Sequence, residues 1–119
     1  MKMMIVVAGV FVAALTVGAN AQQQKMQTSW VNEQGFRVTN FNVRASGSGC
    51  VGSQDYVKVD APNDPTSKGT SRMQWTTATK QDGGVLCSNG VWFSGSGPNK
   101  GQQGGSTRDV LIKNGAYYR

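Results

Sequence analysis

Apolar and polar residues alternate along most of the chain after residue 21. The clearest run places Met73, Trp75 and Thr77 between polar neighbours, and this strand is expected to continue to Lys80. Helical periodicity is nearly absent there, whereas glycine, serine, threonine and asparagine are abundant. Because a period of two puts alternate side chains on the same face of a sheet, the pattern predicts an all-β fold. We expect a small antiparallel sandwich or barrel built from hairpins.

Two pairs of residues in the middle of the chain are suited to two-residue hairpin turns. Asp82-Gly83 and Asn89-Gly90 would divide residues 72–94 into a three-stranded meander. The second turn would place Cys87 and Trp92 side by side on neighbouring strands, where an indole beside a disulfide would form a core nucleus.

A third pair, Asn114-Gly115, predicts a hairpin at the end of the chain. Its register would set Ile112 against Tyr117 and Leu111 against Tyr118. Because the two tyrosines are adjacent, a strand would point them to opposite faces, and we expect one of them to be exposed. The last strand is expected to be an edge strand.

Three other segments interrupt or extend this pattern. The alternation changes phase at Thr39-Asn40, which predicts a β-bulge or a tight turn between two short strands. Residues 56–60 predict a strand with Val57 and Val59 facing inward. Residues 94–106 contain five glycines and no large apolar residue, which predicts a flexible linker or a long exposed loop.

The N-terminus has the organisation of a cleaved signal peptide with an apolar signal helix. Lys2 precedes an uncharged apolar run, and Ala19-Asn20-Ala21 provides the small-residue cleavage pattern. A retained membrane anchor is disfavoured, because the run is shorter than the roughly 20 residues that a spanning helix needs. The expected division is a signal peptide at 1–21, a flexible N-terminal segment at 22–29 and a single β domain at 30–119 with the glycine-rich loop at 94–106.

Charge and location restrict the partners. Eleven of the twelve lysines and arginines lie after residue 21, together with all six acidic residues, so the exported chain carries a net charge of about +5. The basic residues are spread out, and nucleic acid is an uncommon partner outside the cell. We therefore expect no nucleic-acid partner, and no membrane span after cleavage. The expected location is secreted, periplasmic or cell-surface.

Cys50 and Cys87 are the two cysteines of the chain. An even number of cysteines in an oxidising location favours a disulfide. A metal pair lacks partners, because the chain contains no histidine. Closing a loop of this length is worth about 4 kcal/mol in the chain-entropy model.

The residues offer little for catalysis. Histidine, the usual general base, is missing from the sequence. The six carboxylates are scattered, at Glu33, Asp55, Asp60, Asp64, Asp82 and Asp109. The stretch from Ser94 to Gly97 looks like part of a nucleophile elbow but lacks the strand–elbow–helix context. We therefore expect a protein that is not an enzyme and that has no cofactor and no metal.

A binding role remains for the aromatic residues. Trp92, Tyr117, Tyr118 and Arg119 are the candidate binding residues, since an exposed tyrosine beside an arginine suits sugar stacking or a protein interface. A surface glycan or a protein is the expected partner.

One segment resembles a known family. Residues 82–92 (DGGVLCSNGVW) resemble the D-G-x-x-L-x-C-x-x-G-x-W signature near the C-terminus of shufflon-type bacterial pilus-tip adhesins, with the glycines offset by one. Residues 48–52 (SGCVG) resemble the glycine-flanked cysteine that begins the adhesin module, so the likeness covers about residues 48–94. The resemblance implies recognition of a recipient cell or a surface glycan. This chain carries neither the prepilin leader nor the long N-terminal helix of that family, which implies a freestanding secreted module.

Three functions follow as hypotheses. The first is a secreted or surface-associated adhesin-like module that binds a glycan or a protein. The second is a periplasmic inhibitor or immunity-type protein that blocks a hydrolase or toxin, although the basic charge disfavours a basic lysozyme as its target. The third is a component of an envelope secretion or conjugation apparatus.

Overall fold

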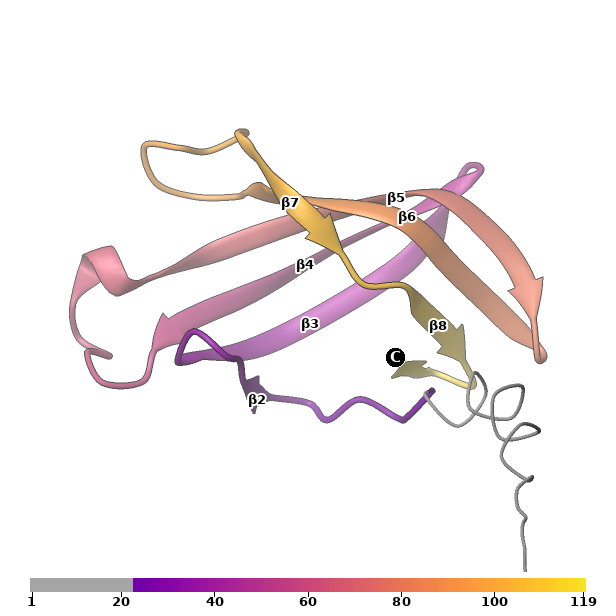
Figure 1. Cartoon of the computed structure of the whole chain (residues 1–119), viewed down its shortest axis with the longest axis horizontal. Coiled ribbons are helices and arrows are strands. Elements are labelled where there is room, and N and C mark those ends of the chain that lie inside the picture. The colour runs from indigo at the N-terminus through magenta and orange to yellow at the C-terminus, as the bar shows by residue number, and fades with distance from the viewer. Residues whose placement is uncertain (1–22) are drawn as a thin grey trace, which may run out of the picture.

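The computed structural model describes residues 23–119, and the expected signal peptide lies outside the described residues. One antiparallel sheet of eight strands contains most of them (Figure 1). The strands are β2 (Trp30–Val31), β3 (Phe36–Ser46), β4 (Gly49–Lys58), β5 (Lys68–Gln81), β6 (Gly84–Ser94), β7 (Gln103–Thr107), β8 (Val110–Lys113) and β9 (Ala116–Tyr118). A single 3-10 turn, η1 (Pro65–Ser67), precedes β5. The all-β, antiparallel prediction is confirmed.

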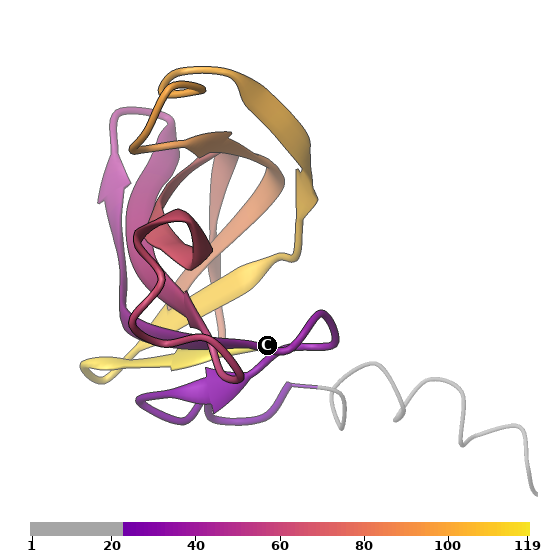
Figure 2. The ribbon, with the colours of Figure 1, turned by 90° about the vertical axis from the view of Figure 1, so that its left-hand side faces the viewer.

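The strands follow one another as a meander that curls into a half-barrel (Figure 2). Their order in the sheet is β2-β3-β4-β5-β6-β8-β9, and β7 pairs with β6 outside this path. One part of β6, Gly90–Phe93, pairs with β7, and another, Val85–Cys87, pairs with β8. The curl leaves a concave inner face along β3, β4, β5 and β6.

The two ends of the described chain meet. The amide nitrogen of Gln24 donates to the main-chain oxygen of Arg119 at 2.7 Å, and the Arg119 amide donates to the Gln24 oxygen at 2.9 Å. The Met26 amide donates to the Tyr117 oxygen at 2.8 Å. The segment that was expected to be flexible therefore pairs with β9, and β9 is not a free edge. The polar composition of this segment does not predict the pairing, because the hydrogen bonds are made by backbone groups and do not depend on the side chains.

The core surrounds the Cys50–Cys87 disulfide, which is present as predicted, with a Cα–Cα distance of 5.9 Å. Trp75 lies against it with 2 % of its surface exposed, and its indole N–H donates to the Arg108 main-chain oxygen at 3.0 Å. The other buried members of the cluster are Val43, Met73 and Val110. The inward placement of Met73 and Trp75 confirms the alternation seen in the sequence.

Two of the three predicted hairpin turns are confirmed. Asp82 and Gly83 have φ values of 52° and 80° and join β5 to β6. Asn114-Gly115 joins β8 to β9, and the two predicted pairs, Ile112 with Tyr117 and Leu111 with Tyr118, are observed. A further two-residue turn at residues 47–48 joins β3 to β4.

The predicted turn at Asn89-Gly90 is wrong. Both residues lie inside β6, so residues 72–94 form a two-stranded hairpin, not a meander, and Cys87 and Trp92 are on the same strand. Gly90 faces Trp75, and a Cβ there would lie 2.5 Å from two atoms of its indole ring. The glycine therefore serves close packing, and the dipeptide alone does not distinguish this role from a turn.

The change of phase at Thr39-Asn40 is a β-bulge within one continuous strand, β3. Asn40 has a positive φ of 54° there.

The prediction for residues 56–60 is partly wrong. β4 begins at Gly49 and ends at Lys58, and Val59 lies beyond it with 49 % of its surface exposed. The polar run before Tyr56 is a strand because it pairs on both sides, with β3 and with β5.

The glycine-rich segment 94–106 is only partly a loop. Residues 103–107 form β7, which pairs with β6. Strand formation is decided here by the partner, since glycine has a low strand propensity of its own. Two further main-chain hydrogen bonds hold the loop. The Gly101 amide donates to the Ser94 oxygen at 2.7 Å, and the Gly95 amide donates to the Thr70 oxygen at 2.8 Å.

Candidate functional site

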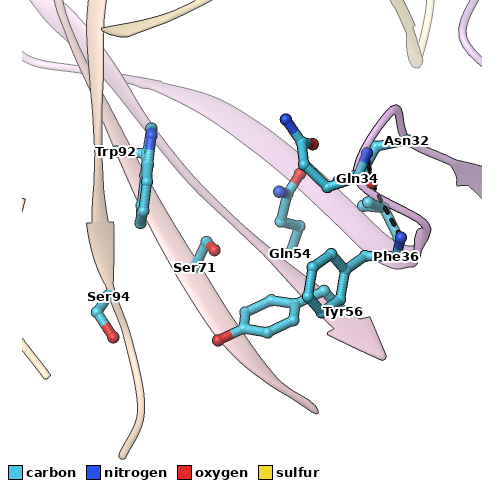
Figure 3. A pocket seen from close by; sticks show the side chains of 9 residues that line it. Asn32, Gln34, Phe36, Gln54, Tyr56, Ser71, Trp92 and Ser94 are labelled. Atoms are coloured by element: carbon cyan, nitrogen blue, oxygen red, sulfur yellow. Dashed lines mark hydrogen bonds between the residues drawn. The ribbon is translucent and has the colours of Figure 1, made fainter. Parts of the chain in front are cut away.

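A cavity of about 520 Å³ lies on the concave face of the half-barrel (Figure 3). Strands β3 to β6 and the loop between β2 and β3 contribute its walls. The lining residues are Asn32, Gln34, Phe36, Val38, Gln54, Tyr56, Ser71, Trp92 and Ser94. These nine residues, here called the aromatic–amide cavity, form the candidate site.

The floor of the cavity is a row of polar side chains that crosses three strands. Gln54 of β4 pairs with Ser71 of β5, and Ser71 pairs with Ser94 of β6. Tyr56 lies two positions along β4 on one side of the row, and Trp92 lies two positions along β6 on the other side. The strand register therefore places hydrogen-bonding groups between two aromatic side chains.

Tyr56 lies across the neighbouring strand because its partner there is a glycine. Tyr56 pairs with Gly69 of β5, and a Cβ on Gly69 would lie 2.6 Å from the Tyr56 hydroxyl oxygen. The Ser96 hydroxyl oxygen occupies the same space and accepts a hydrogen bond from the Thr70 amide at 2.9 Å. The missing side chain leaves room for the phenol ring to lie flat on β5.

Trp92 is positioned in the same way by β7. A Cβ on Gly104 would lie 2.1 Å from the indole Cζ2 atom, so the β7 backbone packs directly against the ring. The indole is still 39 % exposed, and in Figure 3 it stands at the opposite side of the cavity from Phe36 and Tyr56. One part of the ring is thus held by backbone while another part is open to a ligand.

The opposite wall is fixed by an aromatic pair and a short loop. Phe36 and Tyr56 meet edge to face, with ring centroids 5.5 Å apart and planes at 89°. The Asn32 side-chain oxygen accepts hydrogen bonds from the amides of Gln34 and Phe36, at 3.0 and 2.9 Å. This Asx-type turn holds Gln34 above the cavity.

The lining has a consistent chemistry. None of the nine residues carries a charged side chain. Three are aromatic, three carry amides, and three, including one of the aromatic residues, carry hydroxyls. Amides and hydroxyls both donate and accept hydrogen bonds, whereas the faces of aromatic rings attract weakly polarised C–H groups. The cavity therefore suits a neutral ligand with many hydroxyl groups and an apolar face.

The four candidate binding residues from the sequence lie in two places. Trp92 lines the aromatic–amide cavity. Tyr117 and Arg119 belong to a separate cluster with Trp30 and Phe41, and Tyr118 is half-buried on β9, as Tyr117 is. Adjacency on a strand suggested that one tyrosine is exposed, but both are half-buried. Tyr117 packs against the core and the Phe41 ring, and Tyr118 lies opposite Lys25.

The separate cluster joins the end of the chain to β3. Phe41 meets Trp30 and Tyr117 edge to face, at centroid distances of 5.6 and 5.4 Å. The Val43 amide donates to the Tyr117 hydroxyl oxygen at 3.1 Å. The Arg119 guanidinium carbon lies 5.4 Å from the ring centroids of both Trp30 and Phe41. Burial, and secondarily the charge of Arg108, lower the pKa of Arg119.

Sequence reasoning missed most of the cavity. Among its lining residues only Trp92 was a candidate from the sequence, and only the register brings Phe36, Gln54 and Tyr56 together. The available signal was glycine inside strands, at Gly69 and at residues 104–105, because such positions often face a large side chain on the next strand.

Within residues 23–119 no group of three or more histidine, cysteine, aspartate or glutamate side chains is placed to hold a metal ion. The described part of the chain also has no helix of the length and hydrophobicity needed to cross a membrane. The chain matches no family profile, no curated protein and no solved structure.

Proposed function

We propose that this protein is an exported, non-enzymatic module that binds a neutral saccharide in the aromatic–amide cavity. The observation that carries the proposal is the composition of that cavity, in which three aromatic rings surround amide and hydroxyl groups without any charge. A pyranose ring has hydroxyls at its rim and a face of C–H bonds, and these two surfaces match the two kinds of lining residue.

The size and shape of the cavity support the same class of ligand. Its volume of about 520 Å³ falls within the usual range of small-molecule sites, about 300–1,000 Å³. Trp92 and the Phe36–Tyr56 pair are held by backbone and by each other before any ligand arrives. A preorganised site loses less side-chain entropy on binding, which favours recognition of a weakly interacting, hydrated ligand.

The export proposal is supported by the disulfide, which persists in oxidising compartments such as the periplasm or the extracellular space. A saccharide on a cell surface or in the envelope is then an accessible partner. Surface-glycan recognition is also what the resemblance of residues 48–94 to pilus-tip adhesins implies.

The test is direct binding of the purified protein to a panel of neutral oligosaccharides, followed by calorimetry on the best ligand. Trp92→Ala should weaken the affinity at least about tenfold, which corresponds to about 1.4 kcal/mol, because the variant removes the largest stacking surface. Gln74→Ala is the matched control, since Gln74 is an exposed residue of β5 that does not line the cavity. Its affinity should equal that of the wild type.

Binding should also be nearly independent of salt between low and physiological ionic strength, because the lining is uncharged. Absence of saturable binding to every neutral saccharide would overturn the proposal. Stoichiometric capture of one hydrolase or toxin, with Trp92 in the interface, would replace it by the inhibitor hypothesis.

A further inference from the structure

A second hollow, of about 240 Å³, lies where the two ends of the described chain meet. The lining residues are Gln24, Lys25, Met26, Gln27, Trp30, Arg108 and Arg119. Three of them are cationic: Lys25 lies near one end of the described chain, and Arg108 and Arg119 lie near the other. We call this group the terminal cationic hollow.

The charged side chains of the hollow are all positive. No acidic side chain is among its lining residues. Asp109 follows Arg108 in the chain but is not a lining residue. Arg108 acts on Arg119 as a like charge, which is the second cause of the lowered pKa of Arg119. Like charges held together in a partly desolvated place are unfavourable unless an anion lies between them.

A second observation comes from the hydrogen bonds. The Nε atom of Arg119 is buried and has no hydrogen-bond partner among the described residues. The guanidinium itself is held beside the rings of Trp30 and Phe41. An arginine donor that is buried without an acceptor is costly, and an oxyanion is the acceptor that guanidinium groups bind best.

From this geometry we propose that the terminal cationic hollow is a binding site for a small oxyanion: a sulfate, phosphate or carboxylate group. Arg119 forms the base of the site beside Trp30, while the exposed Lys25 and Arg108 form its rim. The site is separate from the aromatic–amide cavity and does not depend on saccharide binding there. It also assigns a purpose to the pairing of residues 24–26 with the end of the chain, in which Lys25 lies opposite Tyr118 and Gln24 bonds to Arg119.

Two classes of probe distinguish the sources of such a group. Inorganic sulfate and phosphate represent the free anion, and N-acetylneuraminic acid and a sulfated disaccharide represent an anion carried on a sugar. The readout is the indole N–H signal of Trp30 in nuclear magnetic resonance, titrated against sodium chloride at equal ionic strength. Saturable movement with either class of probe, and not with chloride, is expected, and the class that binds identifies the source.

The decisive variant is Arg108→Gln, matched by Lys80→Gln, which changes the net charge equally at the exposed end of β5. Arg108 is exposed and contacts the core through its main-chain oxygen, which the substitution keeps. Arg108→Gln should weaken anion binding about tenfold, and Lys80→Gln should leave it unchanged. Equal weakening in both variants, or no saturable response in the wild type, overturns the proposal.

Discussion

At the scale of single residues, glycine decides where the aromatic side chains of the cavity lie. Gly69 receives the Tyr56 ring, Gly104 packs against the Trp92 indole, and Gly90 makes room for Trp75 in the core. All three lie in strands, where glycine is intrinsically unfavourable. The loss of strand propensity is offset by contacts between aromatic rings and backbone that a Cβ would prevent.

Gly104→Ala tests this arrangement. The new Cβ would start 2.1 Å from the Trp92 ring, so the indole or β7 must move. We expect a destabilisation of about 1–3 kcal/mol and weaker saccharide binding, measured by urea unfolding and by calorimetry. Gly105→Ala is a close control, because its Cβ would meet the indole at an ordinary 3.6 Å. Equal losses in both variants would show that strand propensity, not the ring contact, sets the cost.

At the scale of elements, two irregularities control which residues face the cavity. Cys87 and Gly90 both face inward although three positions separate them, which a regular strand forbids. The strand changes phase at Asn89, which has a positive φ of 59°. The Asn89 side chain donates to the Thr77 hydroxyl at 3.0 Å. Without this change of phase, Trp92 could not lie on the same face as the disulfide.

The bulge at Asn40 likewise changes which side chains of β3 face inward, so that Val38 and Val43 are both buried. Beyond the bulge, β3 is contacted by β9. β2 pairs with only two residues of β3, and further along that strand the Val43 amide is satisfied by the Tyr117 hydroxyl. A side chain thus does what a strand partner would do.

Tyr117→Phe should therefore destabilise the fold by about 1–3 kcal/mol, the usual cost of leaving a buried amide without an acceptor. Chemical denaturation measures this difference, and hydrogen exchange of the Val43 amide should accelerate in parallel. Tyr118→Phe, the same change on the neighbouring residue, should stay within about 0.5 kcal/mol of the wild type. If the two variants were equally stable, the Tyr117 hydroxyl would have no role in closing the sheet.

At the scale of the whole molecule, the disulfide links two strands of the curled sheet that are not neighbours in it. Cys50 lies at the start of β4 and Cys87 in β6, on either side of β5. Their separation of 37 residues corresponds to about 4 kcal/mol of loop-closure entropy.

Reduction, or replacement of both cysteines by alanine, should lower the free energy of unfolding by about 2–5 kcal/mol. Guanidinium unfolding of the oxidised and reduced protein measures the difference. The double-alanine variant should unfold at the same denaturant concentration with and without reductant, which controls for effects of the reductant itself. Identical midpoints for oxidised and reduced wild type would contradict the proposed role.

The sequence by itself determined the local features of this protein. Alternation predicted the strands, the residue types in two turns predicted their hairpins, and the cysteine count predicted the disulfide; each of these depends on neighbouring residues or on composition. At the C-terminal hairpin this extended to individual pairs, such as Ile112 with Tyr117.

Tertiary structure alone decided the rest, because it depends on partners far away in the sequence. Asn89-Gly90 has the same local preference in a turn and in a kinked strand, and the indole of Trp75 selects the strand. The glycines at 104–105 become a strand only beside β6. Both proposed sites are of this kind, since the cavity combines residues from five segments and the terminal cationic hollow joins the two ends of the described chain.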